Sequence, residues 1–285
     1  MKLLYSVPFS NRSLTFFLPK GLYGAFAIVY RGTNGTTPKN RKDLGNVNLV
    51  WNGTSIINVD AELLSLLADL KAGYSTFQSI TESILNAMIY IPCGTYEDNK
   101  NAYLIDDTTK VYFKLDFPNL ANINGNVYIY GIERLGVHNY FYNILSRFVV
   151  SGGAGTLSDV QYISNAREMF IKNLSIINSI QIQKDKQLVL DALTPDVLAL
   201  SDFENQVESS SSLVVINFNK SNDVREIVGN EIIYKYVFNT SGTLEQYFAF
   251  ITFNNPSKSA NVVQSTISKR IVDATQQAKS SLAVD

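Results

Sequence analysis

Short stretches in which apolar and polar residues alternate recur along most of the chain, separated by clusters of Gly, Pro, Asn, Asp and Ser. Successive side chains of a β-strand point to opposite faces, so a period of two predicts strands buried on one face. Many short strands at regular spacing are typical of β-sandwiches and barrels. We therefore predict an all-β fold with strands at Leu14–Leu18, Ala25–Arg31, Val47–Trp51, Met88–Ile91, Val111–Phe117, Val127–Ile132, Val160–Ile163, Ile176–Gln183, Leu188–Leu190, Leu213–Phe218, Ile232–Phe238 and Leu244–Phe253.

Two amphipathic segments interrupt the strand pattern and predict short inserted helices. Asp60 is placed to cap a helix over Ala61–Leu70, whose leucines form one broad apolar face. Thr194 is placed to cap a second helix, with Pro195 at its first helical position and an apolar stripe over Val197–Phe203.

The two helices occupy equivalent places in a repeated pattern. Aligning Val47–Gly53 with Ile180–Lys186 also carries Leu64 onto Val197. The order of strand, polar turn, apolar segment and capped helix recurs with a period of roughly 125 to 135 residues, far longer than a solenoid repeat. Two unrelated β domains would also share strands, but not this order of elements. A chain of 285 residues is moreover long enough for two hydrophobic cores.

We predict a first domain over residues 1–135, a second over 136–256 and a C-terminal extension over 257–285. The small residues of Ser151–Gly155 predict a loop near the start of the second domain. The segment Gly32–Gly45 predicts another exposed loop. In the extension, apolar residues from Val263 to Leu282 recur at three- and four-residue spacing, which predicts a helix, although a disordered terminus is nearly as consistent with it.

Charge and composition exclude several classes of protein. With 24 Lys and Arg against 25 Asp and Glu, the chain has a formal net charge of −1 and no basic block to line a phosphate-binding surface. Cys93 is the only cysteine, so an internal disulfide framework is impossible and folding in a reducing cytosol is expected. The N-terminal residues make a poor signal peptide, and no apolar run is long enough for a membrane-spanning helix.

The sequence lacks the combinations of residues that catalysis needs. His138 is the only histidine, so a triad or a thiol pair with Cys93 would depend on that one ring. Asp106 and Asp107 are more simply explained as a solvated turn than as calcium or glycosidase carboxylates. Trp51 lies at strand spacing, which favours a core or interface residue over a sugar-stacking platform. We predict no catalytic, cofactor or metal site, and a protein that is not an enzyme.

Three segments and their order resemble a known family. Ser13–Gly21, Gly24–Gly32 and Asn46–Gly53, followed by the leucine-rich helix, look like the opening jelly roll of double jelly-roll major capsid proteins. The likeness is to those of icosahedral bacteriophages with an internal membrane, of the corticovirus and finnlakevirus types. Ile180–Phe203 resembles the equivalent stretch of their second jelly roll, and the C-terminal extension departs from the pattern by its length.

The resemblance implies two tandem jelly-roll domains and a homotrimer whose six jelly rolls form a pseudo-hexagonal tile of a virion capsid. The expected partners are other copies of the chain, an internal lipid membrane and minor or penton capsid proteins, without sequence-specific nucleic acid. The chain would be made in the host cytoplasm. A tandem β-sandwich that binds carbohydrate, or a viral fibre or spike protein, remains the alternative, and a glycan-active enzyme with two carboxylates is the third interpretation.

Overall fold

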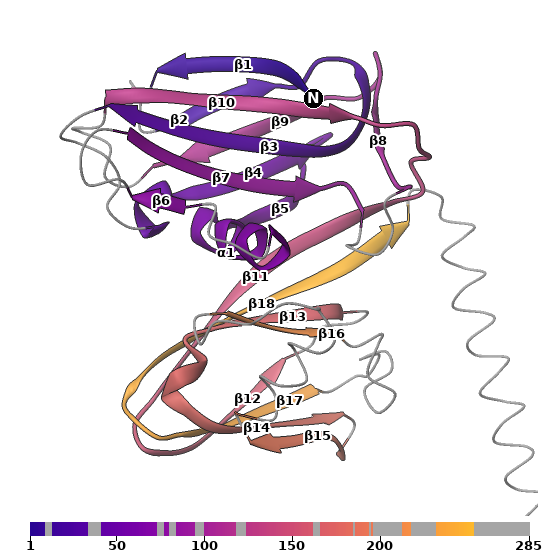
Figure 1. Cartoon of the computed structure of the whole chain (residues 1–285). Coiled ribbons are helices and arrows are strands. Elements are labelled where there is room, and N and C mark those ends of the chain that lie inside the picture. The colour runs from indigo at the N-terminus through magenta and orange to yellow at the C-terminus, as the bar shows by residue number, and fades with distance from the viewer. Residues whose placement is uncertain are drawn as a thin grey trace, which may run out of the picture.

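A computed structural model describes residues 1–8, 13–33, 41–72, 77–79, 84–94, 100–117, 124–161, 166–184, 186–193, 195, 213–217 and 232–253. The strands form two stacked halves, and two long strands, β11 and β18, run between them (Figure 1). The described part of the tail ends at Phe253, so the predicted C-terminal helix lies outside the described residues.

The first half contains one α-helix and a short 3-10 helix among its described residues. Its helices are η1, Arg41–Leu44, and α1, Ala61–Ala72. Its strands are β1 Lys2–Pro8, β2 Ser13–Phe17, β3 Gly21–Thr33, β4 Asn46–Trp51, β5 Thr54–Asp60, β6 Phe77–Ser79, β7 Ile84–Pro92, β8 Tyr103–Ile105, β9 Val111–Asp116 and β10 Asn124–Glu133. The second half contains the short helix η3, Leu174–Ile176. Its strands are β11 Tyr140–Gly152, β12 Gly155–Gln161, β13 Ala166–Lys172, β14 Ile177–Lys184, β15 Gln187–Leu193, β16 Leu213–Asn217, β17 Ile232–Phe238 and β18 Gly242–Phe253.

The two halves have the same strand order. In the first, β1-β10-β3-β7 form one sheet, extended by β6 and β8, and β5-β4-β9-β2 form the facing one. In the second, the corresponding orders are β11-β18-β13-β16 and β15-β14-β17-β12. Leaving out β6 and β8, each strand of one half occupies the place held by its counterpart in chain order in the other. Each half is therefore an eight-stranded jelly roll, and the prediction of a double jelly roll is confirmed.

The hairpins that the sequence alignment matched are equivalent in the structure. β4 and β5 are joined by Asn52 and Gly53, with φ angles of 48° and 85°. β14 and β15 are joined at the aligned position, where Lys186 has a φ of 69°. Positive φ angles at two-residue hairpin turns match the right-handed twist of the strands, which explains why the turn recurs with strands on both sides.

Helix α1 follows directly from the first of these hairpins. The backbone N–H of Leu63 donates to Oδ1 of Asp60 at 2.8 Å, so Asp60 caps the helix as predicted. Leu63, Leu64 and Leu67 are buried in the first core. The helix ends at Ala72, two residues beyond the predicted end at Leu70. The predicted second helix, Val197–Phe203, lies outside the described residues.

Two predicted loops are shorter at their ends than expected, and residues 34–40 of the second one lie outside the described residues. The segment Ser151–Gly155 was predicted to be too flexible for strands, but β11 extends to Gly152, which pairs with Gly242, and β12 begins at Gly155. Gly152 lies against the ring of Phe238, which a Cβ would approach to 2.9 Å, so the small residue allows close packing. In the other loop, β3 continues to Thr33 and Leu44 is buried in η1.

Six strands were missed because their sequences lack clean alternation. β6 and β8 have three residues each, and β1 lies at a sheet edge, where it pairs with β10 alone among the described strands. β5, β11 and β13 contain polar residues that are buried or half-buried, such as Asp60, Asn143 and Glu168, so their burial does not follow the alternation of apolar and polar residues. Such strands give a weak sequence signal because their packing is set by distant segments.

The described residues form two hydrophobic cores, and one of them crosses the boundary between the jelly rolls. The second core contains only second-half residues, such as Ile180, Tyr236 and Phe248. The core of the first jelly roll also includes residues of β13, β16 and β18, among them Phe170, Val215 and Tyr247. One face of the sheet β11-β18-β13-β16 therefore belongs to the second core and the other to the first.

Two glycines with positive φ allow a matched test of close backbone approach. Gly45 has a φ of +78°, and a Cβ there would overlap the carbonyl oxygen of Asp116, whereas Gly53 has a φ of +85° and open space around it. We expect Gly53→Ala to cost about 1–2 kcal/mol from backbone strain, and Gly45→Ala to cost about 3 kcal/mol or more because strands must also separate. Urea unfolding of both variants checks this; equal midpoints would contradict the packing at Gly45.

Candidate functional site at the junction of the two jelly rolls

The junction begins where the edge strand of one jelly roll meets the edge strand of the other. β5 and β11 run parallel, with Ile57 opposite Ile144. This pairing joins two four-stranded sheets into one eight-stranded sheet that spans both halves. Both isoleucines are buried, so the seam between the jelly rolls is closed to water.

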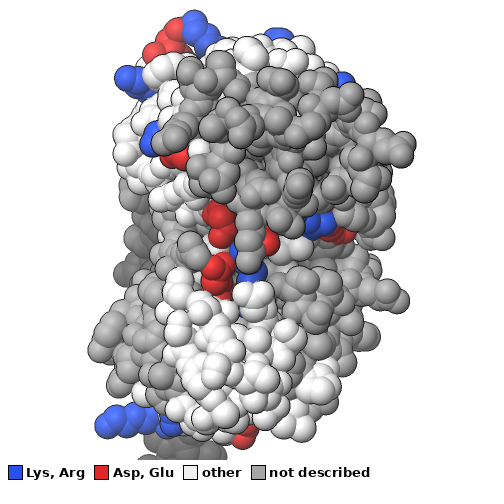
Figure 2. All heavy atoms as spheres, turned by 90° about the vertical axis from the view of Figure 1, so that its left-hand side faces the viewer, with Lys and Arg blue, Asp and Glu red and all other residues white. Residues whose placement is uncertain are grey.

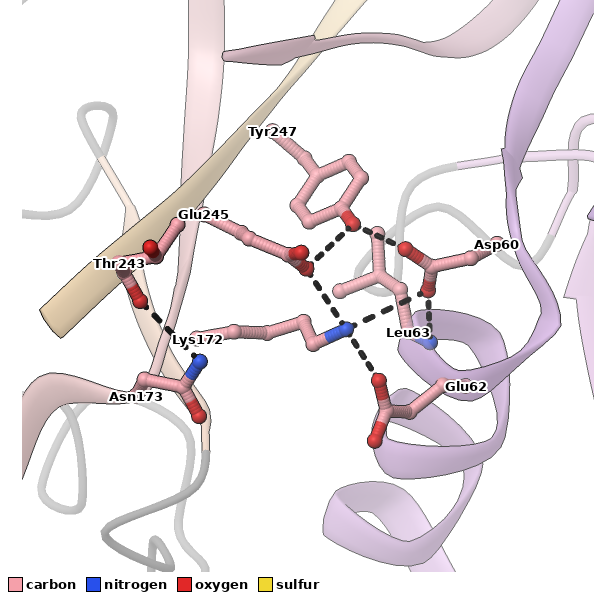
Figure 3. Close-up of polar contacts among 8 residues, drawn as sticks. All are labelled: Asp60, Glu62, Leu63, Lys172, Asn173, Thr243, Glu245 and Tyr247. Carbon is pink, nitrogen blue, oxygen red and sulfur yellow. Dashed lines mark hydrogen bonds and ion pairs between the residues drawn. The ribbon is translucent and has the colours of Figure 1, made fainter. Parts of the chain in front are cut away.

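A buried lysine lies beside this seam (Figure 3). Lys172, at the end of β13, has a side chain only 5% exposed. Its Nζ forms ion pairs with Glu62 of α1, with Oε2 of Glu245 of β18 at 2.9 Å, and with Oδ1 of Asp60 at 3.6 Å. Asp60 and Glu62 come from the first jelly roll and Glu245 from the second, so one ammonium group connects both halves.

Burial by itself lowers the pKa of Lys172, but the charge of Asp60 and the hydrogen bonds to Glu62 and Glu245 outweigh it, so the pKa is raised. The lysine is therefore held in its charged form. Replacing Lys172 alone by a neutral residue would leave the partner carboxylates charged and poorly solvated, which is strongly unfavourable.

Three carboxylates surround one ammonium group, and further groups balance the excess negative charge. The hydroxyl of Tyr247 lies within hydrogen-bonding distance of Asp60 and, at 3.1 Å, of Glu245. Asp60 and Glu62 also sit at the N-terminus of α1, where the helix dipole stabilises negative charge. Charged side chains of both signs gather at the level where the halves meet (Figure 2). We call Asp60, Glu62, Lys172, Glu245 and Tyr247 the junction cluster.

A second polar network holds the start of β11 against the first jelly roll. Asn101 donates to the carbonyl oxygen of Tyr140 at 3.0 Å and to that of Cys93, and it accepts from the backbone N–H of Asn139 at 3.0 Å. The hydroxyl of Tyr103 accepts from the backbone N–H of Tyr142 at 3.1 Å. Asn101 and Tyr103 thus satisfy backbone groups where the chain passes from one half to the other.

Cys93 and His138, the weighed thiol pair, have surroundings unsuited to catalysis. Cys93 is fully buried, and burial raises the pKa of its thiol, whereas a nucleophilic cysteine needs a lowered one. His138 packs among the rings of Trp51, Tyr103 and Phe141, with centroid distances of 5.2, 5.3 and 4.6 Å. Burial lowers the pKa of His138 to about 4, so the ring is neutral near pH 7.

The remaining candidates also have structural roles. Asp106 accepts from the backbone N–H and the hydroxyl of Thr108, at 2.8 and 2.7 Å, and these hydrogen bonds lower its pKa. Asp107 pairs with Lys20 at the surface. Trp51 is only 9% exposed, which leaves little ring surface for a sugar. In the described ranges, no three His, Cys, Asp or Glu side chains are grouped to hold a metal ion, and no helix is long and apolar enough to span a membrane.

Sequence reasoning missed the junction cluster except for the capping role of Asp60. The available signal was weak: Lys172 ends a strand with buried apolar residues, and Glu245 lies in a strand that also contains Tyr247 and three phenylalanines. Charges in apolar strands indicate partners when buried, but the sequence does not identify them. Lys172 and Tyr247 lie more than 100 residues after Glu62 and Asp60, the residues that they contact.

Solved structures with this fold are similar over most of the chain. The major capsid protein of Sulfolobus turreted icosahedral virus aligns with a TM-score of 0.69 at 10% identity, covering 90% of this chain and 97% of that one. The major capsid protein of bacteriophage PM2 aligns with 0.64 at 12%, covering 90% and 96%. The PBCV-1 virus capsid aligns with 0.61 at 9%, covering 88% and 91%. No family model and no curated protein matches the sequence. The chain shares the double jelly-roll fold of these proteins.

Removing the buried cation tests the junction cluster. Lys172→Met preserves much of the side-chain volume but leaves three carboxylates without their ion-pair partner, so we expect a loss of about 3–5 kcal/mol in the free energy of unfolding. The matched control is Lys114→Met, which breaks an ion pair with Asp116 whose side chains are 46% and 39% exposed. That control should change stability by about 0–1 kcal/mol. Equal effects in urea unfolding would contradict the proposed role of Lys172.

The half-buried imidazole of His138 predicts a pH dependence of stability. His138 has a pKa of about 4 in the folded protein against 6.5 in the reference state, so the unfolded chain binds a proton first as pH falls. The folded state should keep its full stability above pH 6.5 and lose stability relative to a His138→Phe variant as pH falls toward about 4. Unfolding midpoints of both proteins across this range measure the difference. A constant difference between the two proteins would show that His138 titrates normally.

Proposed function

We propose that this chain is the major capsid protein of an icosahedral virus, a structural protein of the virion and not an enzyme. The proposal rests on the double jelly-roll fold that this chain shares with several viral capsid proteins. The alignments with the capsid proteins of Sulfolobus turreted icosahedral virus and bacteriophage PM2 each cover 90% of this chain, and 97% and 96% of those chains. A shared fold does not by itself establish a shared function, so the proposal also needs support from the properties of this molecule.

The junction supports a role as a tile. A continuous eight-stranded sheet, a shared apolar core and the junction cluster hold the two jelly rolls in one relative placement. A rigid unit with two similar halves can make nearly equivalent contacts with neighbouring copies through either half. In a homotrimer, such a unit presents six similar jelly rolls and packs as a pseudo-hexagon, so one gene product can cover a closed shell.

We also propose the finer points that the sequence suggested. The division at residues 1–135 and 136–256 is supported by the connection between β10, which ends at Glu133, and β11, which begins at Tyr140. The extension over 257–285 is proposed as a segment that contacts neighbouring capsomers. The narrower lineage, phages with an internal membrane, and the partners it implies, lipid and penton or minor capsid proteins, rest on the sequence resemblance.

The alternative functions have less support. The ring that the sequence suggested for sugar stacking, that of Trp51, instead packs against Tyr103 and Phe141 at centroid distances of 5.7 and 5.0 Å. A glycosidase needs a carboxylic acid with a raised pKa, whereas hydrogen bonds from Thr108 and Thr109 lower the pKa of Asp106. The capsid role therefore agrees best with the side-chain environments.

Assembly of the purified full chain tests the proposal. We expect a trimer in analytical ultracentrifugation at micromolar concentration, with subunit contacts that bury roughly 2,000 Å² or more, as in obligate oligomers. Concentrated protein should form sheets or shells visible by electron microscopy. A stable monomer that forms no higher assembly and binds immobilised glycans would contradict the capsid role and favour the carbohydrate-binding alternative.

A further inference from the structure

The two jelly rolls contain equivalent sheets, but only the sheet of the second jelly roll is covered on its outer face by another part of the described chain. In the second jelly roll, the outer face of the sheet β11-β18-β13-β16 is covered by the first jelly roll. Tyr142, Ile144, Phe170, Val215 and Tyr247 lie on this face, and each is at most 3% exposed within the first core. This face is apolar because it is an interface within the chain.

The corresponding sheet of the first jelly roll, β1-β10-β3-β7, has an outer face of aromatic and aliphatic side chains with one charged residue among them, Arg31, which lies over the ring of Tyr128 at 5.3 Å from its centroid. Strand register places Leu3 beside Tyr130, Val29 beside Tyr128, and Met88 beside Val29. These side chains are half-buried, except Leu3, which is 49% exposed. The sheet faces the viewer in Figure 1, with no described helix or strand in front of it. We call this surface the outer aromatic face.

The edge strands of the two sheets differ in the same way. β11 contacts β5, and its residues Tyr140, Tyr142 and Ile144 are buried. β1 is its counterpart, and it pairs only with β10 among the described strands. No residue of β1 is buried, as expected for a strand that lacks a neighbour on one side.

The strand that should supply the missing contact is exposed elsewhere on the molecule. β15 is the counterpart of β5, and among the described strands it pairs only with β14. In β15, Leu188 and Leu193, which the hairpin alignment places at Ser55 and Asp60 of β5, are 53% and 59% exposed. The hairpin alignment places Leu193 at the position of Asp60, so an apolar residue stands where the junction cluster begins.

We propose that β15 of one copy packs against β1 and the outer aromatic face of the next copy, as β5 packs against β11 and its sheet within each chain. The proposal rests on the capsid function above and assigns the surfaces through which its subunits meet. The strand equivalent to β5 is β15, which belongs to the second jelly roll of this same sequence. The partner that presents β15 is therefore a second copy of the chain. The contact joins two different surfaces, so each chain offers one of each and successive copies can close into a ring.

The matching surfaces explain where exposed apolar residues lie. Leu3 on β1 and Leu188 and Leu193 on β15 are among the exposed large hydrophobic residues of the described chain, and the proposed contact covers them. The junction within the chain relies on buried charge at Lys172, whereas the contact between chains relies on aromatic and aliphatic side chains. An apolar contact requires no ion pair to form in the correct geometry before two separate subunits can bind.

Two variants, one for each surface, test the proposal in the full chain. Leu193→Asp alters β15 and Leu3→Asp alters the β1 side, and each should convert the trimer into a folded monomer in sedimentation velocity. Circular dichroism and thermal melting verify folding, and Leu188→Asp replaces Leu193→Asp if that variant unfolds. The control is Leu135→Asp, at a residue that is 95% exposed outside both surfaces, and it should remain trimeric.

Mixing the two monomeric variants gives the sharper result. One variant keeps an intact β15 and the other an intact outer aromatic face, so the mixture should form a dimer through one unaltered contact. A mixture that stays monomeric, or Leu193→Asp and Leu3→Asp proteins that remain trimeric, would overturn the assignment while the wild-type trimer leaves the capsid function standing. A wild-type chain that is monomeric and forms no shells would instead overturn both proposals.

Discussion

The Lys172 ammonium group lies in a nearly water-free place between two jelly rolls, and the placement of those rolls depends on its neutralisation. Asp60 and Glu62 approach it from the first half and Glu245 from the second. Moving one half relative to the other would separate a buried cation from its anions, which costs several times the energy of a surface ion pair. The junction is thus resistant to bending, and α1 contributes because its N-terminus holds two of the carboxylates.

The fixed junction makes the two jelly rolls one rigid unit. The β5–β11 pairing extends one sheet through both halves, and residues of four second-half strands, β11, β13, β16 and β18, complete the first core. The two jelly rolls therefore behave as one block with two similar sides. The same geometry, repeated between copies instead of within one, accounts for the exposed edge at β15 and the apolar surface around β1. Internal duplication thus produces both the rigid two-domain subunit and the pair of surfaces proposed to join one subunit to the next.

Local features were predictable because the residues that form them are adjacent in sequence. Asp60 caps α1, Asn52 and Gly53 form the first hairpin turn, and the matched turn at Lys186 revealed the duplication. Most strands with clean alternation were found for the same reason. The missed strands, such as β11, alternate poorly because one face contacts its own core and the other contacts the opposite jelly roll. Ser151–Gly155 resembled a loop, yet Gly152 lies in a strand because Phe238 packs closely against it.

The sequence by itself determined the strand-rich fold, the turns, the capped helix and the repetition of one unit, since each depends on short-range backbone preferences and on which side of a strand is apolar. Only the tertiary structure decided which strand edges meet, and hence that β5 joins β11 and that Lys172 reaches Asp60, Glu62 and Glu245. Alternation identifies the buried face of a strand but carries no information about its neighbour. That choice depends on the packing of residues that are far apart in sequence, from 87 positions for Ile57 and Ile144 to 187 for Asp60 and Tyr247. Chain connectivity imposes little restriction at such separations, so the burial of apolar surface and charge selects the partner.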